Sequence, residues 1–161
     1  MGAPKVKTSF SDKDHVTIVV TKDYPASTAN TAAQVWGIVA DFSNVKTIFP
    51  SLLRNYLTYP DETQNRVGTI RDMTFGGKSL SVAIEQLKAI DDEKRSLTYI
   101  SLAGLPVTNY ISVIKVSGDN ACTLSWTIDY DQQPLNKEFA KGLAQLFVEG
   151  ENEIAKVLDL S

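Results

Sequence analysis

The sequence is poor in the two side chains that most often bind metals or form covalent links. Its 161 residues include one cysteine, Cys122, and one histidine, His15. A single cysteine cannot form an internal disulfide, and one Cys with one His is too few for a zinc site of the usual nitrogen and sulfur type. We therefore expect no metal, and a reducing compartment, the cytoplasm.

Long apolar runs and clusters of one charge are also missing. No stretch approaches transmembrane length, and residues 1–13 are polar where a signal peptide requires an unbroken apolar segment. Lys and Arg total 16 against 19 Asp and Glu, for a net charge of −3, and no basic cluster stands out. We expect no nucleic-acid partner and no stable membrane anchoring.

Apolar residues make up 43% of the chain, enough for a sizeable core without covalent support. No repeat, low-complexity run or linker divides the sequence. We expect one domain over residues 1–161, with residues 1–13 flexible.

The order of local patterns predicts an α+β domain. The β-branched run in Val16–Tyr24 favours a first strand, and Thr31 to Gln34 fits a capping box in which Thr31 caps a helix. A second short helix is expected to end before Pro50. From Arg54 to Tyr130, short β-rich stretches alternate with turn signals, and such close spacing favours an antiparallel meander.

A long C-terminal helix is expected after Pro134, with Asn136 as its cap. Glycines at Gly142 and Gly150 suggest a bend or a close approach within it; the alternatives are fraying or plain tolerance of glycine there. Apolar residues recur at helical spacing and should face the sheet: Phe139, Leu143, Leu146, Phe147, Ile154, Val157 and Leu158.

Strand alternation places charges on faces that are otherwise half apolar. Arg71 shares a face with Met73 and Phe75, and Glu85 shares one that runs from Ser81 to Ala89. The matching faces of the later strands carry Tyr99, Tyr110, Ser112 and Trp126. This mixture predicts a pocket for a mainly apolar ligand, lined by Tyr99, Ser112 and Trp126 and closed by Phe139, Leu143 and Phe147. Alternatively, Arg71 and Glu85 form a structural ion pair, or a register slip turns them towards solvent.

Several stretches resemble one known family, the polyketide cyclase/dehydrase and lipid-transport group of the START-like, birch-pollen-allergen superfamily. The resemblance implies a helix-grip fold, in which a curved antiparallel sheet of about seven strands surrounds the C-terminal helix and two short helices follow the first strand. It spans most of the chain and rests on these stretches: Val35 to Asn44, Phe49-Pro50, Val67 to Arg71, Glu85 to Leu87, Asp91-Asp92, Leu97 to Tyr99, Leu105-Pro106, Asn109-Tyr110 and Leu124 to Trp126.

Within that superfamily the sequence looks most like the lachrymatory-factor synthase branch. Proteins of that branch use an arginine, a glutamate and a tyrosine for proton transfer on a small sulfenic acid. The resemblance places the corresponding roles on Arg71, Glu85 and Tyr110. Other members of the superfamily are cyclases, isomerases, hormone receptors and lipid carriers, so the fold does not select the substrate.

The sequence therefore supports a protein that binds a small hydrophobic or amphipathic molecule and transforms it by proton transfer without a cofactor, as a cyclase, lyase or isomerase. The alternative is a non-catalytic carrier in which the same polar groups orient the ligand. A third possibility, an interaction module with a filled core, predicts no pocket. The ligand and the oligomeric state stay open.

Overall fold

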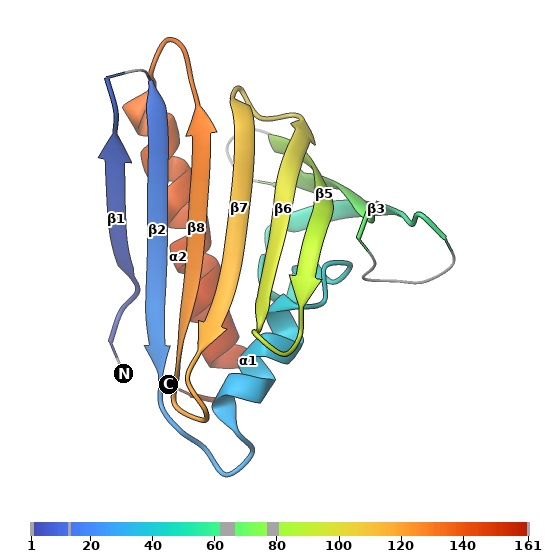
Figure 1. The fold of residues 1–161 in the computed structure, drawn as a ribbon, viewed down its shortest axis with the longest axis vertical. Coiled ribbons are helices and arrows are strands. Elements are labelled where there is room, and N and C mark those ends of the chain that lie inside the picture. The colour runs from blue at the N-terminus through green and yellow to red at the C-terminus, as the bar shows by residue number, and fades with distance from the viewer. Residues whose placement is uncertain (1, 13, 62–66, 77–80, 161) are drawn as a thin grey trace.

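The structure is a computed structural model, and it describes residues 2–12, 14–61, 67–76 and 81–160. A curved sheet carries one long helix along its inner face (Figure 1). The strands are β1 (Lys5–Phe10), β2 (His15–Tyr24), β3 (Leu52–Thr58), β4 (Ile70–Phe75), β5 (Ser81–Asp91), β6 (Ser96–Ala103), β7 (Thr108–Ser117) and β8 (Cys122–Asp131). The helices are α1 (Thr31–Val39), the short 3₁₀ helix η1 (Val45–Thr47) and α2 (Lys137–Val157).

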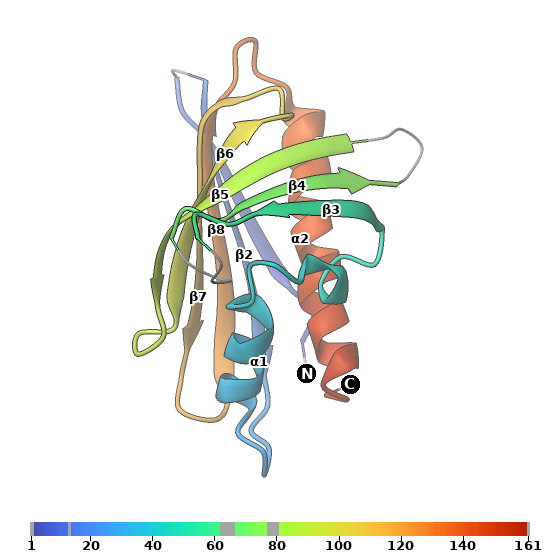
Figure 2. The same ribbon diagram turned by 90° about the vertical axis from the view of Figure 1, so that its right-hand side faces the viewer.

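The sheet has eight antiparallel strands in the order β1-β2-β8-β7-β6-β5-β4-β3. Strands β3 to β8 form a meander, as predicted, and β8 returns beside β2. The segment that carries α1 and η1 connects β2, which lies next to the edge strand β1, to β3 at the opposite edge of the sheet (Figure 2). This arrangement confirms the helix-grip fold.

The N-terminal segment differs from expectation, because residues 5–10 form strand β1 instead of a flexible tail. This strand pairs antiparallel with β2, from Lys5 opposite Thr21 to Phe10 opposite Val16. It adds one strand to the predicted sheet and makes β2 the second strand. Edge strands commonly carry charged side chains such as lysine, so their polar sequences resemble those of flexible tails. Residues 1 and 13 lie outside the described residues.

The cap of α1 also differs from the predicted capping box. Asn30 is the N-cap, and its side-chain oxygen accepts a hydrogen bond from the Ala33 amide at 3.0 Å. Thr31 lies inside the helix, where its hydroxyl donates to the Pro25 carbonyl at 2.6 Å. Asn30 has φ of 60°, a left-handed conformation that asparagine tolerates better than threonine.

Helix α2 begins as predicted, with the Asn136 side chain accepting from the Phe139 amide at 3.0 Å. Gly150 provides the close approach that was one of the expectations, because a Cβ there would meet Phe49 Cε1 at 2.8 Å. Val157 was predicted to face the sheet but is 50% exposed, whereas Glu151 is fully buried. Within the part of the chain that the structure describes, no helix has both the length and the apolar character needed to span a membrane.

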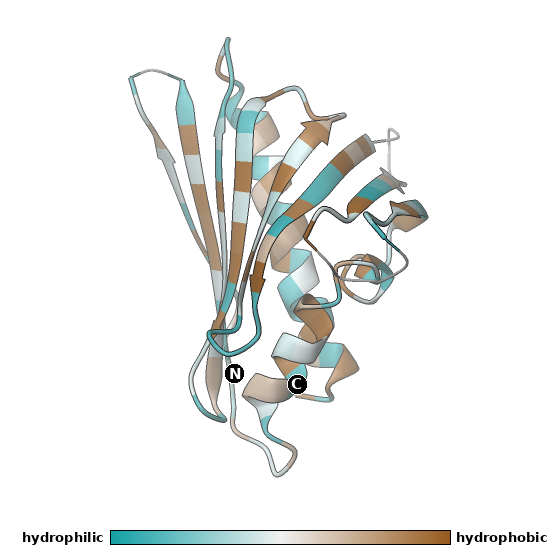
Figure 3. Cartoon of the chain, turned by 45° about the vertical axis from the view of Figure 1, so that its right-hand side comes forward, coloured by the Kyte–Doolittle hydropathy of each residue, from teal (hydrophilic) through white to brown (hydrophobic). Residues whose placement is uncertain are grey.

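Alternation along the strands separates an inner from an outer face, seen as alternating hydrophobic and hydrophilic bands in Figure 3. The predicted inner residues of β4, β7 and β8 are buried, Arg71, Tyr110 and Trp126 among them. Ala89 of β5 is an exception and is exposed. The pairing with β6 shifts between Leu87 and Ala89, and this irregularity breaks the alternation.

Candidate functional site

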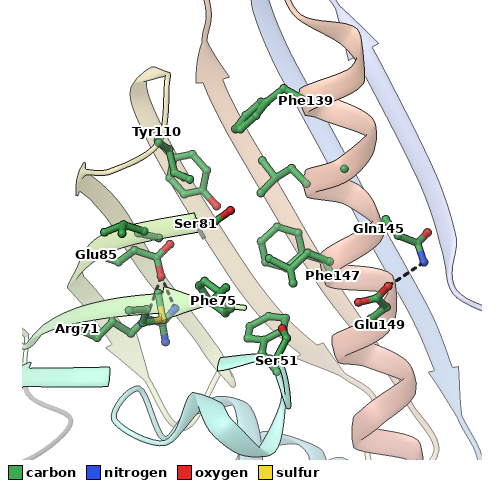
Figure 4. Close-up of a pocket in the computed structure, with 18 of the residues that line it drawn as sticks. Ser51, Arg71, Phe75, Ser81, Glu85, Tyr110, Phe139, Gln145, Phe147 and Glu149 are labelled. Atoms are coloured by element: carbon green, nitrogen blue, oxygen red, sulfur yellow. Dashed lines mark hydrogen bonds and ion pairs between the residues drawn. The ribbon is translucent and has the colours of Figure 1, made fainter. Parts of the chain in front are cut away.

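A pocket of about 510 Å³ lies between the inner face of the sheet and α2. Its volume is within the range of small-molecule sites. Figure 4 shows strand residues on one side and helix residues on the other. It is lined by Phe49, Ser51, Arg71, Met73, Phe75, Gly76, Ser81, Val82, Ala83, Glu85, Tyr99, Leu105, Tyr110, Phe139, Gly142, Leu143, Gln145, Leu146, Phe147 and Glu149.

Arg71 and Glu85 meet inside this pocket, because they are direct cross-strand partners on β4 and β5. Arg71 Nε lies 2.9 Å and Arg71 Nη2 lies 2.8 Å from the same carboxylate oxygen, Glu85 Oε1. The two residues are 4% and 5% exposed. They therefore face inward, and the alternative in which a register slip turns them towards solvent is wrong.

Aromatic rings and a carbonyl hold the guanidinium group of Arg71 in place. Its Cζ lies 3.9 Å from the centroid of the Phe42 ring and 4.8 Å from that of Tyr99. Its Nη1 donates to the Phe42 carbonyl at 3.3 Å. These contacts give the guanidinium a fixed orientation, since cations are attracted to the faces of aromatic rings.

Glu85 keeps one oxygen free for a ligand. Both hydrogen bonds from Arg71 go to Oε1, and no other described residue donates to Oε2. Oε2 is not among the fully buried polar atoms without a partner, so it is open to the pocket. Burial raises the pKa of Glu85, and the charge of Arg71 and its hydrogen bond oppose this shift. Glu85 can therefore accept or donate a proton nearer neutral pH than an ordinary glutamate can.

Tyr110 completes the polar end of the pocket from β7. It lines the same space as Arg71 and Glu85, and its ring centroid lies 6.3 Å from that of Tyr99. Burial raises the pKa of Tyr110 well above its usual value, and the neighbouring Tyr99 and Glu85 add to this shift. Tyr110 is therefore a neutral hydroxyl that can donate a hydrogen bond at physiological pH.

Two of the predicted ligand-binding residues do not line the pocket. Trp126 and Ser112 lie beside Tyr99 on the inner face, where the Trp126 indole N–H donates to the Tyr99 hydroxyl at 2.9 Å and to Ser112 Oγ at 3.0 Å. They position the hydroxyl of Tyr99, which does line the pocket. Phe139, Leu143 and Phe147 line it from α2, where the sequence had placed them.

Several lining residues were missed by the sequence-based prediction of the site. Met73 and Phe75 share the inner face of β4 with Arg71, so their alternation was a usable signal. Phe49 and Ser51 come from the irregular segment after η1, where no periodic pattern indicates an orientation. Glu149 lies on the exposed side of the α2 stripe, yet it reaches the rim of the pocket.

Together the curved antiparallel sheet and the long C-terminal helix define a protein of the helix-grip class. The family model for "polyketide cyclase / dehydrase and lipid transport" matches residues 16–159, so the chain belongs to this family. No curated protein matches the chain.

Solved structures share the fold at low sequence identity. The XoxI protein of Bacillus cereus is 20% identical, with a TM-score of 0.70 over 88% of this chain and 94% of that chain. Major latex-like protein 151 of Panax ginseng is 16% identical, with a TM-score of 0.69 over 88% and 95% of the two chains. A protein of Bacillus thuringiensis is 22% identical, with a TM-score of 0.65 over 89% and 97%. These similarities confirm the fold alone.

Proposed function

We propose that this protein binds a small, mainly hydrophobic molecule in the pocket and transforms it by cofactor-free proton transfer. The observation that carries this proposal is the free oxygen of Glu85, because a buried carboxylate with one oxygen open to an apolar pocket is well placed to take a proton from a bound molecule. The reaction class is that of a cyclase, lyase or isomerase.

Each polar group has a distinct role in this proposal. Glu85 Oε2 accepts the proton, and Arg71 stabilises negative charge that develops on the substrate. Tyr110, a neutral hydroxyl at the same end of the pocket, donates or relays a proton. The resemblance to the lachrymatory-factor synthase branch supports this division of roles, since that branch uses the same three residue types.

The second candidate function is a carrier that binds a hydrophobic ligand without changing it. The raised pKa of Glu85 favours this alternative, since a protonated carboxyl group would only donate a hydrogen bond to the ligand. The lining, with Phe75, Phe139 and Phe147, would serve a carrier equally well. A cytoplasmic location and the absence of a cofactor stay predictions in both cases.

A base-sensitive probe distinguishes the two functions. 5-Nitrobenzisoxazole opens when a base removes its ring C–H proton and the N–O bond breaks, which yields a coloured phenolate. We expect the protein to accelerate this reaction, with a rate that rises with pH as Glu85 loses its proton. Glu85→Gln should lower the rate by on the order of 10²-fold or more.

Binding must be followed in the same variant. Glu85→Gln is close in shape to the native residue. It leaves Arg71 without its counter-charge and therefore lowers stability, but the folded variant should retain the pocket and bind the probe with little change in affinity. If the wild-type protein binds the probe but does not accelerate its ring opening, the result favours the carrier function over the enzymatic one. Native mass spectrometry of the purified protein would then identify the natural ligand by its mass.

A further inference from the structure

A second pocket of about 330 Å³ adjoins the first, between α2 and the segment that follows η1. The two pockets share four lining residues, namely Phe49, Ser51, Leu146 and Glu149. They are therefore neighbouring compartments with a common wall between α2 and the segment that follows η1. The two compartments thus lie next to each other, on either side of these four residues.

The charges of the two compartments are distributed unevenly. Arg71 pairs with Glu85 in the first compartment, and Lys156 pairs with Glu153 at 3.6 Å in the second. Glu149 lines both compartments, yet no described residue forms an ion pair with it. Its one hydrogen bond comes from the neutral Gln145 side chain at 3.4 Å, as Figure 4 shows. The junction therefore carries an uncompensated negative charge.

We infer that the ligand is an elongated amphiphile whose apolar part fills the first compartment and whose cationic group lies at Glu149, in the passage to the second. This inference rests on the proposed function of the first pocket and specifies the class of molecule that it takes. The cationic group of the ligand forms the ion pair that no described residue forms with Glu149. An anionic group at the same place meets an unpaired carboxylate and is disfavoured.

Three probes of equal chain length test the charge. Dodecylammonium, dodecanoate and dodecanol are titrated into the protein by calorimetry, each below its micelle-forming concentration. We expect dodecylammonium to bind more tightly than the other two. Because Glu149 is exposed, Glu149→Gln should weaken dodecylammonium by roughly two- to fivefold and leave dodecanol unchanged. Glu138→Gln, an exposed glutamate in the first turn of the same helix, is the matched control and should change neither.

A plug at the junction tests the passage. Ser51 is exposed and lines both compartments, so Ser51→Trp should narrow the path between them. We expect dodecylammonium to lose on the order of tenfold in affinity. Ser117→Trp adds the same side chain at an exposed position of β7 that lines neither compartment, and should have no effect.

The outcomes separate this inference from the function on which it rests. Equal affinity of dodecylammonium for the wild-type protein, Ser51→Trp and Glu149→Gln would overturn the inference, because neither the junction nor the charge of Glu149 would then contribute to binding. Tighter binding of dodecanoate than of dodecylammonium also overturns it. Failure of the wild-type protein to bind anilinonaphthalene sulfonate instead argues against the first pocket as a ligand site.

Discussion

The ion pair of Arg71 and Glu85 gives the most direct prediction for a single residue. Removing one partner leaves the other charge buried without compensation, at a cost of about 3 to 5 kcal/mol. We therefore expect Arg71→Met to lower the free energy of unfolding by this amount in a urea titration. The double variant Arg71→Met/Glu85→Leu should recover most of the loss, because no unpaired charge remains. A double variant as unstable as the single one would contradict this account.

A second buried carboxyl group, Glu151 of α2, lies outside the pocket. It is fully buried, and neither of its carboxyl oxygens has a hydrogen-bond partner among the described residues. Burial raises its pKa to about 8, although the nearby Lys22 opposes the shift. The native state therefore holds a proton on Glu151 at neutral pH.

This proton predicts a pH dependence of stability. Since the pKa of about 8 in the folded state exceeds the ordinary value of 4.5, unfolding releases the proton between these two pH values. The contribution of Glu151 to the free energy of unfolding thus falls as pH rises, by up to about 1.4 kcal/mol per pH unit. We expect Glu151→Gln to remove this slope in urea titrations across that range, and Glu138→Gln to leave it unchanged. An unaltered slope in Glu151→Gln would show that Glu151 is ionised in the folded protein.

At the scale of elements, the packing of α2 can be tested with two glycines of the same helix. A Cβ at Gly150 would meet Phe49 Cε1 at 2.8 Å and Ile48 Cγ2 at 2.9 Å, whereas a Cβ at Gly142 has nothing within 4 Å. Alanine stabilises a helix interior by about 1 kcal/mol over glycine. We expect Gly142→Ala to raise the melting temperature. Gly150→Ala should lower it, because the steric conflict exceeds that gain. Equal effects of the two variants would contradict the close packing of α2 on η1.

Most elements could be predicted because their sequences carry a regular pattern. Alternation along β4, β7 and β8 identified the inner face, and Asn136 marked the start of α2. Strand β1 was not predicted because it is an edge strand with a polar sequence and mostly exposed side chains, which resembles a flexible tail. The bulge near Ala89 was not predicted because it depends on the pairing with the partner strand β6.

The sequence predicted which side chains of the candidate site face inward, but not which of them line the pocket. Strand parity correctly turned Arg71, Glu85 and Tyr110 inward. Parity could not tell that Tyr99 lines the pocket while Ser112 and Trp126 do not, because all three share the same buried face. Which side chains reach the pocket depends on the curvature of the sheet, and a sequence pattern does not contain that curvature.

At the scale of the whole molecule, the pocket results from how the sheet curves around the helix. Helix α2 packs chiefly against β2, whereas β4 and β5 run across the direction of the helix axis (Figure 2). Side chains from both layers fill part of the space between them, and the remainder is the pocket of about 510 Å³. The fold therefore provides the site, and the residues Arg71, Glu85 and Tyr110 give it chemical character.

The most direct test of this account is a fluorescence titration with anilinonaphthalene sulfonate. Ala83 is buried on β5 and lines the pocket, whereas Ala89 lies on the same strand but is exposed. The account predicts saturable binding at one site in the wild-type protein, at least tenfold weaker binding in Ala83→Phe because the ring occupies the pocket, and unchanged binding in Ala89→Phe. Folded Ala83→Phe protein that binds the probe as tightly as the wild-type protein would contradict it.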